Sequence, residues 1–289
     1  MGTRCQVQVY AQSEVLADKA VNAVMDDVER LEAKYSRYRD TSFLSDINRT
    51  ASAGGSIAVD EETAYLLDYA ETCYTLSEGL FDISSGVLRS VWQFDSGKLP
   101  DDSTLQTLLQ RIGWHRLHWC KPELVFDTAG MELDFGGVVK EYAADRAATL
   151  CQEHGITHGL VNLGGDIRVV GPHPDGSPWK IGISNPQQPD QAVITLELFH
   201  GALASSGDYE RCMTIAGKRY GHVLNPLTGW PVSHMAAVSV LADFCVVAGS
   251  ASTIGMLREA NGADWLEALG LPHLWIDVNG NTGGSLASG

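Results

Sequence analysis

Residues 132–170 read ELDFGGVVKEYAADRAATLCQEHGITHGLVNLGGDIRVV, and this stretch indicates the fold class. A Gly-Gly pair from Gly136 predicts the start of a helix that continues to about residue 154. A buried strand is expected at Gly159–Leu163, followed by a Gly-Gly turn and a second strand at Asp166–Val170. The stretch is therefore expected to fold as a helix followed by two strands that a tight turn connects.

Helical patterns dominate before this stretch, and strand patterns dominate after it. That order favours an α+β fold, with mixed sheets and flanking helices, over a regular doubly wound sheet. We expect a two-lobed single domain over residues 1–289, with a lobe boundary near 95–103 and a flexible tail at 279–289. Further helices are expected from about Ser13, at roughly 60–78, from Asp101, at about 245–260 and near 263–269, and further strands at about 4–11, 115–120, 123–127, 179–183, 193–198, 203–205, 212–215, 238–241 and 274–278.

The composition is that of a globular protein, apart from its charge. The chain has 289 residues, of which 44% are apolar and 19% are charged, and its formal net charge is −16. Such an acidic balance argues against nucleic acid as a partner. An anionic small-molecule ligand would need a local cation, a metal ion or backbone amides at its site.

The sequence predicts no transmembrane segment, because no run approaches the roughly 18 apolar residues that a membrane-spanning helix needs. The N-terminus also lacks the apolar core of a signal peptide. Six cysteines lie far apart without a CxxC pair, which favours reduced thiols. The compartment stays open: it is cytoplasmic for the sequence as written, and periplasmic if a leader has been removed.

Two glycine-rich segments can bring the backbone close to a ligand. The segment DFGG, from Asp134, precedes Lys140, and helix N-terminal amides with a lysine form an anion site. A plain helix cap with a solvated lysine is the alternative. The segment GGD, from Gly164, either approaches a ligand closely or makes a tight turn between strands. It lacks the glycine spacing and the following helix of the GxGxxG dinucleotide motif.

Two further segments carry side chains that can bind phosphate or move a proton. In ASSGDYER, residues 204–211, hydroxyls and amides beside glycine can hold phosphate oxygens, and Asp208 can hold a ribose hydroxyl or orient Arg211. Taken alone, this segment is a favourable turn. In YGHVLNPLTG, residues 220–229, His222 can exchange a proton near neutral pH, or can be a structural donor at a strand end.

The order and spacing of these motifs resemble the ApbE family of flavin transferases. The resemblance starts at Met1-Gly2-Thr3, extends beyond residue 250, and includes YRDTSFLSDIN at 38–48. It implies an ApbE-like fold and the activity of an FAD:protein FMN transferase. Such an enzyme uses Mg²⁺ and moves FMN from FAD to a Thr or Ser hydroxyl of an acceptor flavoprotein, with release of AMP. FAD is then the substrate, and the acceptor flavoprotein is the second partner.

The resemblance also implies roles for individual residues. Catalysis falls to His222, Lys140 and Arg211, and the last two help to hold the diphosphate. A metal ion is bound by the Gly137 carbonyl and the Thr253 hydroxyl. The positions that match cofactor-binding residues are Met1, Tyr38, Asp134, Gly164, Gly165, Asp166, Ser205, Ser206, Gly207, Asp208 and Thr228.

The chain departs from the family's motifs inside the expected site. A segment that usually reads Lys-Gly-Tyr-Ala-Val-Asp is KEYAAD here, from Lys140. The last helix of the family usually carries an Asp and a Thr four residues apart, which bind the metal from one helical face. Thr253 matches this Thr, but Gly249 stands at the position of the Asp.

The missing aspartate leaves several interpretations open. The metal can be held by the FAD diphosphate with Thr253 and the Gly137 carbonyl, or a carboxylate such as Asp243 or Asp208 can reach the site. The protein can instead bind FAD with little or no transfer activity, or cleave FAD slowly as a pyrophosphatase. An engineered substitution is a further alternative.

Overall fold

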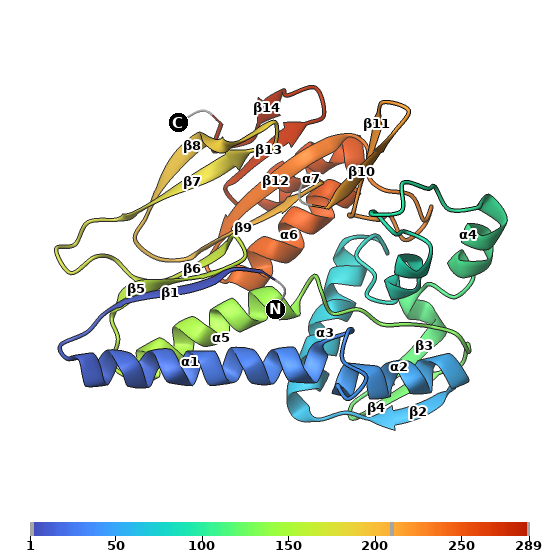
Figure 1. The fold of residues 1–289 in the computed structure, drawn as a ribbon, viewed down its shortest axis with the longest axis horizontal. Coiled ribbons are helices and arrows are strands. Elements are labelled where there is room, and N and C mark those ends of the chain that lie inside the picture. Colours follow the sequence, from blue (N-terminus) through green and yellow to red (C-terminus); the bar gives the residue numbers. More distant parts are fainter. Residues whose placement is uncertain (1–2, 209–210, 288–289) are drawn as a thin grey trace.

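A seven-stranded sheet is the largest sheet among the residues that the computed structural model describes, which are 3–208 and 211–287 (Figure 1). Neighbouring strands in this sheet run antiparallel. In spatial order the strands are β1 (Cys5–Tyr10), β5 (His158–Leu163), β6 (Asp166–Gly171), β9 (Ala202–Gly207), β12 (Met235–Ala242), β13 (His273–Asp277) and β14 (Thr282–Gly283).

Helices cover one face of this sheet, and a hairpin covers the other. The helix α5 (Val139–Glu153) packs on β5 and β6, α6 (Cys245–Leu257) packs on β9 and β12, and α1 (Glu14–Tyr35) packs on α5. The hairpin β7/β8 contributes Trp179 to the apolar cluster on the opposite face. Side chains alternate between the faces along each strand, as in β5, where Val161 joins the helical side and Leu160 joins the hairpin side.

The remaining elements lie around this central arrangement (Figure 1). Their presence confirms the α+β fold class, with sheets and flanking helices. They are the three-stranded sheet β2 (Gly55–Ala58), β4 (Glu123–Phe126) and β3 (Leu117–Cys120), the hairpins β7 (Trp179–Asn185) with β8 (Gln188–Leu198) and β10 (Cys212–Ile215) with β11 (Lys218–Gly221), and the helices α2 (Phe43–Ala53), α3 (Glu61–Leu76), α4 (Asp102–Leu109) and α7 (Gly262–Leu269).

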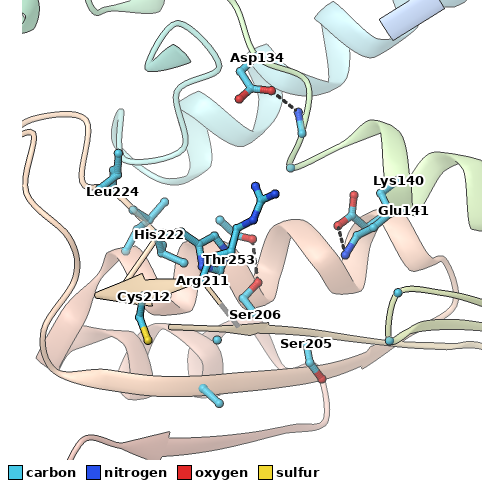
Figure 2. A pocket seen from close by; sticks show the side chains of 18 of the residues that line it. Asp134, Lys140, Glu141, Ser205, Ser206, Arg211, Cys212, His222, Leu224 and Thr253 are labelled. Carbon is cyan, nitrogen blue, oxygen red and sulfur yellow. Dashed lines mark hydrogen bonds and ion pairs between the residues drawn. The ribbon is translucent and has the colours of Figure 1, made fainter. Parts of the chain in front are cut away.

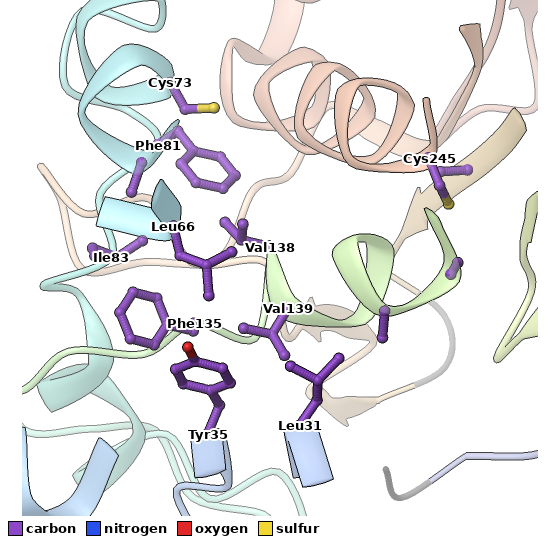
Figure 3. Close-up of a cluster of buried hydrophobic side chains, with 14 of the residues drawn as sticks. Leu31, Tyr35, Leu66, Cys73, Phe81, Ile83, Phe135, Val138, Val139 and Cys245 are labelled. Carbon is purple, nitrogen blue, oxygen red and sulfur yellow. The ribbon is translucent and has the colours of Figure 1, made fainter. Parts of the chain in front are cut away.

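A cluster of buried apolar side chains lies where α1, α3 and the segment before α5 meet (Figure 3). Phe135 is only 1% exposed and makes an edge-to-face contact with Tyr35, with the ring centroids 5.6 Å apart. The ring of Phe81 packs against Gly137, so that a Cβ at this glycine would lie 3.4 Å from the ring. Close packing of this kind holds a backbone firmly. The core therefore fixes residues 135–137 on the wall of the pocket described below.

Most elements expected from the sequence are present within a few residues of their predicted bounds. The helix expected from Ser13 is α1, and the Ser13 hydroxyl caps it by accepting the amide of Leu16 at 3.3 Å. Among the described helices and strands, α2, β2, β11 and β14 were not expected. None of the described helices is both long and apolar enough to cross a membrane.

Two features bear on the expected domain organisation. Residues 95–103, at the expected lobe boundary, lie largely in a loop before α4, and the boundary itself stays a prediction. Within the expected tail, β14 pairs with β13, and the amide of Leu286 donates to the carbonyl of His273 at 3.0 Å. Up to residue 287 the tail is therefore packed against the main sheet.

Candidate functional site

A pocket of about 1280 Å³ is lined by residues of the strands β5, β6 and β9 and of two further segments, 80–96 and 134–141. Figure 2 shows side chains from α5, α6, β9 and the β10/β11 hairpin around it. Most of the predicted site residues line this pocket, namely Tyr38, Asp134, Gly137, Lys140, Gly164, Gly165, Ser205, Ser206, Gly207, Arg211, His222 and Thr253.

Three of the predicted residues that the structure describes are not part of the pocket lining. Met1 lies outside the described residues. Asp166 lies behind the wall and is 2% exposed. Thr228 belongs to a turn outside the pocket, where its hydroxyl accepts the amide of Trp230 at 3.2 Å. Asp208 is 4% exposed and faces a different arginine from the one expected.

The partner of Asp208 is Arg219, not Arg211. Both carboxylate oxygens of Asp208 accept from the Arg219 guanidinium, at 2.8 and 3.1 Å. Arg219 lies on β11, a short strand that the sequence analysis did not predict. Because both oxygens are engaged, Asp208 anchors the β10/β11 hairpin, and this corrects the expectation that it orients Arg211.

Two arginines contact the hydroxyl of Tyr38 at one end of the pocket. Arg37 donates to this hydroxyl at 2.9 Å and forms an ion pair with Asp134. Arg211 also hydrogen-bonds to the Tyr38 hydroxyl. Partial burial raises the pKa of Tyr38, but the hydrogen bonds from Arg37 and Arg211 outweigh it, so that the pKa lies below its ordinary value. This end of the pocket is suited to a ligand with an aromatic ring that stacks on these side chains and an anionic group that lies beside the two arginines.

The start of α5 offers fewer open amides than the sequence predicted. The amide of Gly136 donates to Asp134 Oδ1 at 2.8 Å, and the amides of Val138 and Val139 both donate to the carbonyl of Phe135 at 3.0 Å. The glycine pair also precedes the helix, whose N-cap is Val138. The expectation of unpaired amides at this helix start is therefore wrong for these three residues, because the Asp134 carboxylate and the Phe135 carbonyl accept their hydrogen bonds.

The segment GGD forms a two-residue turn that also borders the pocket. Gly164 and Gly165 have φ angles of +65° and +95°, and they connect the paired residues Leu163 and Asp166. Positive φ at both turn positions is the geometry of a type I′ hairpin, which favours glycine. The tight strand turn is therefore confirmed, and the close approach of this turn to a ligand stays a prediction, although both glycines line the pocket.

A row of hydroxyl groups connects β9 to α6 along the pocket. The Ser206 hydroxyl lies 2.9 Å from Thr253 Oγ1 and 2.8 Å from the hydroxyl of Ser252. The Ser205 hydroxyl lies 2.7 Å from that of Ser239. Hydroxyl groups both donate and accept, so this row can bind phosphate oxygens or contribute oxygen ligands to a hard cation.

His222 and Arg211 occupy matching places at the open end of the β10/β11 hairpin. Cys212 pairs with Gly221 in that hairpin, so the residues just outside the pair, Arg211 and His222, lie across from each other (Figure 2). His222 is half-buried and lines the pocket. A titratable imidazole and a guanidinium thus line the same pocket, where the first can exchange a proton and the second can bind an anion.

Lys140 reaches the far wall of the pocket, where two carboxylates are buried. Its Nζ lies 2.7 Å from Asp166 Oδ2 and 3.9 Å from Glu141 Oε1. Glu141 is 6% exposed and lines the pocket. Burial, and then the charge of Asp166, raise the pKa of Glu141 above its ordinary value. Glu141 was not among the site residues predicted from the sequence, although KEYAAD carries it where the family's motif has glycine.

No three His, Cys, Asp or Glu side chains gather as a metal-binding group within residues 3–208 and 211–287. A cation in the pocket would therefore rely on hydroxyl, carbonyl and ligand oxygens with at most a small number of carboxylates. The pocket is large, is lined by glycine turns and hydroxyls, and has arginines at one end. These features are suited to an extended anionic ligand with an aromatic part.

The chain belongs to the ApbE family, whose sequence profile matches residues 1–275. It is 30% identical to the FAD:protein FMN transferase of Vibrio cholerae, over 96% of this chain and 85% of that protein. It is also 30% identical to the FAD:protein FMN transferase of Treponema pallidum, over 92% of this chain and 82% of that protein. Among solved structures, the ApbE protein of Thermotoga maritima matches with a TM-score of 0.89 and 28% identity, over 98% of this chain and 94% of that one.

Proposed function

We propose that this protein is an FAD:protein FMN transferase that moves FMN from FAD to a Thr or Ser hydroxyl of an acceptor flavoprotein and releases AMP. The observation that carries the proposal is the pocket of about 1280 Å³ in which the family's motif residues, from separate segments between Tyr38 and Thr253, meet. A pocket of this volume accommodates a dinucleotide. The names of the two relatives described above support the same reaction.

In the proposed reaction, the oxygen of the acceptor hydroxyl attacks the phosphorus of the FMN half of FAD. A new P–O bond forms, the bridging P–O bond of the diphosphate breaks, and its electron pair leaves with AMP. In this proposal His222 takes the hydroxyl proton, and its position in the pocket lining across from Arg211 supports that role. Arg211 and the hydroxyls of Ser205 and Ser206 hold the diphosphate oxygens, a role that their presence in the same lining supports.

Lys140 acts through Asp166 in this proposal. Its ammonium lies 2.7 Å from Asp166 Oδ2, and Asp166 Oδ1 accepts the amide of Ser205 at 3.2 Å. Lys140 and Asp166 therefore connect α5 to β9 and position the Ser205 backbone beside the diphosphate. In this proposal Lys140 positions the Ser205 backbone through Asp166, and it is not a solvated lysine that contacts the phosphate directly.

The donor atoms at the inner wall fit Mg²⁺. The Gly137 carbonyl and the Thr253 hydroxyl would hold it there, since Mg²⁺ prefers oxygen ligands and commonly shares them with substrate phosphates. When bound, the metal would neutralise part of the charge that develops on the diphosphate during transfer.

The proposal is tested by incubating the protein with FAD, Mg²⁺ and an acceptor domain that carries its Thr or Ser site. The expected result is FMN attached to the acceptor, seen as fluorescence on a denaturing gel and by mass spectrometry, with one AMP released per FMN attached. EDTA and an acceptor whose hydroxyl is replaced by a methyl group should both abolish labelling.

Two other outcomes would refute the proposed transfer. FAD that stays bound and intact would indicate a flavin-binding protein without transfer activity. AMP and free FMN that appear at the same rate without an acceptor would indicate an FAD pyrophosphatase.

A further inference from the structure

Glu141 of α5 fills a space beside Gly249 of α6. A Cβ atom at position 249 would lie 2.5 Å from Glu141 Cγ and 3.2 Å from Glu141 Oε1. Real Cβ atoms do not approach other atoms as closely as 2.5 Å, so any side chain at 249 would displace this glutamate. The absence of a side chain at Gly249 therefore makes the room in which the Glu141 carboxylate sits.

The Glu141 carboxylate lacks the partners that a buried charge requires. Its Oε2 is buried and accepts no hydrogen bond from the described residues, and its Oε1 lies 3.9 Å from the ammonium of Lys140. That ammonium is much nearer to Asp166, at 2.7 Å. Buried polar atoms are nearly always hydrogen-bonded or bound to a metal, because desolvation without a partner is costly. A cation at Glu141 Oε2 would supply the partner that this buried oxygen lacks.

Oxygen atoms suited to such a cation lie along the same face of α6. Thr253 follows Gly249 by one helical turn, so the two positions face the same way, with Cβ positions roughly 6 Å apart. The carboxylate of Glu141 lies against the first position and the hydroxyl of Thr253 stands at the second. Gly137 lines the same pocket. Carboxylate, hydroxyl and carbonyl oxygens together are the ligands that hard divalent cations prefer.

The other carboxylates near this wall are engaged or distant. Asp166 is paired with Lys140 and accepts the amide of Ser205. Asp208 is held by Arg219. Asp243 is exposed and does not line the pocket. Among the buried carboxylates of the described pocket wall, Glu141 is the one with an oxygen that accepts no hydrogen bond.

We propose that Glu141 supplies the carboxylate ligand of a divalent-cation site completed by Thr253, and that Gly249 is glycine because this carboxylate occupies the space beside it. The inference rests on the proposed function, which gives the cation a diphosphate to neutralise. It places the charged ligand on α5, whereas the resemblance to the family placed it on α6. The site is therefore rearranged between two helices and is not lost.

Mn²⁺ binding, followed by the loss of its free-ion electron paramagnetic resonance signal, tests the proposal without measuring catalysis. Wild-type protein is compared with Glu141→Gln, which keeps the shape and removes the charge, and with Asp243→Asn as a matched control outside the pocket. We expect Glu141→Gln to weaken Mn²⁺ binding by about tenfold or more, because the charge count of the ligands sets the affinity. Asp243→Asn should bind like wild type. Unchanged Mn²⁺ affinity in folded Glu141→Gln would overturn the proposal.

A second comparison moves the carboxylate to the other helix. Glu141→Gly removes the carboxylate, and Glu141→Gly with Gly249→Asp offers one from α6 in the vacated space. The double variant should recover Mn²⁺ affinity to within about threefold of wild type, whereas Glu141→Gly alone should not. Equal affinity of these two variants would contradict the proposal even if Glu141→Gln failed to fold. Circular dichroism and thermal melting establish that each variant is folded.

The outcomes also separate this inference from the proposed function. A wild-type protein that binds Mn²⁺ through Glu141 but attaches no FMN to an acceptor would refute the transfer activity and leave the cation site standing. A wild-type protein that transfers FMN while Glu141→Gln binds Mn²⁺ normally would refute only the role of Glu141.

Discussion

Asn48 holds the backbone of Leu133 through two hydrogen bonds. The amide of Leu133 donates to Asn48 Oδ1 at 2.7 Å, and Asn48 Nδ2 donates to the carbonyl of Leu133 at 2.9 Å. Asn48 belongs to α2, and Leu133 directly precedes Asp134 on the pocket wall. The Asn48 side-chain amide donates and accepts as the backbone of a neighbouring strand would, and it thereby holds α2 against the segment that leads into the site.

We expect Asn48→Ala to lower the free energy of unfolding by about 1–3 kcal/mol, because it leaves an amide and a carbonyl of Leu133 without their partners. Urea denaturation measures the change. Asn279→Ala, at an exposed asparagine, is the control and should stay within about 0.5 kcal/mol of wild type. Similar stability of both variants would show that water replaces the two bonds at no cost.

His222→Ala should slow FMN transfer by about 10²- to 10⁴-fold, since the acceptor hydroxyl loses its proton acceptor. Retention of FAD should change much less, because Arg211 and the serine hydroxyls remain in the pocket. Rates of acceptor labelling and equilibrium dialysis of FAD measure the two effects. His200→Ala, at an exposed histidine outside the pocket, is the matched control. An equal loss of FAD binding and transfer would assign His222 to ligand binding.

Glu62 stabilises the contact between α1 and α3 in a pH-dependent way. It accepts hydrogen bonds from Arg30 at 2.7 and 2.8 Å and from Lys34 at 2.8 Å. The hydrogen bonds from Arg30 are the main cause that lowers the pKa of Glu62 from 4.5 to about 2. Since the folded-state pKa is depressed, the stabilisation is fully present above about pH 4.5 and disappears as the pH falls through 2.

Glu62→Gln should therefore lower the free energy of unfolding by about 1–2 kcal/mol at pH 7, a value reduced from the full shift because Arg30 is partly exposed. The difference from wild type should shrink between pH 4.5 and pH 2. Urea denaturation across this range measures it, with the exposed Glu153→Gln as the control. A difference that is constant with pH would mean that packing, and not charge, is lost.

Arg219→Met should destabilise the protein by about 2–4 kcal/mol at neutral pH, because it leaves the buried carboxylate of Asp208 without its cation. Burial raises the pKa of Asp208, and Arg219 counteracts that effect. Without Arg219 the pKa rises further, so the destabilisation should lessen as the pH falls and Asp208 takes up a proton. Thermal melting at several pH values measures this change.

The double variant Arg219→Met with Asp208→Asn separates a structural ion pair from a ligand-binding role. It should recover at least half of the lost stability, because no buried charge remains. If Asp208→Asn alone weakens FAD binding while the fold keeps its stability, the original prediction of a ribose contact would regain support.

The sequence predicted the elements that carry strong periodicity and missed those that depend on distant partners. The helix α1 and the strand pair β5/β6 have clear patterns and clear end signals, and they appear as expected. The helix α2 has Leu44, Ile47 and Ala51 on one buried face, but most of its residues are polar and its contact with Leu133 is far away in sequence. Such short polar elements are stabilised by tertiary contacts that no local pattern reveals.

The site shows the same division between local and long-range information. The motifs predicted which segments line the pocket, because each motif carries its own glycines and hydroxyls. They did not predict that Arg219 would form an ion pair with Asp208, since the β10/β11 hairpin that carries Arg219 was not recognised. Glu141 in place of glycine and Gly249 in place of aspartate were each visible in the sequence. Only the packing of α5 against α6 shows that the two changes occupy one space.

The pairing of β1 with β5 has a consequence for how this protein is synthesised. Cys5 pairs with Leu163, so β1 finds its partner only after a further 158 residues (163 − 5) have been translated. At about 5–20 residues per second, this wait lasts on the order of ten to thirty seconds. During that time β1 presents an unpaired edge that can join other nascent chains. Translation speed and chaperone supply are therefore expected to govern the yield of this protein as strongly as its final stability does.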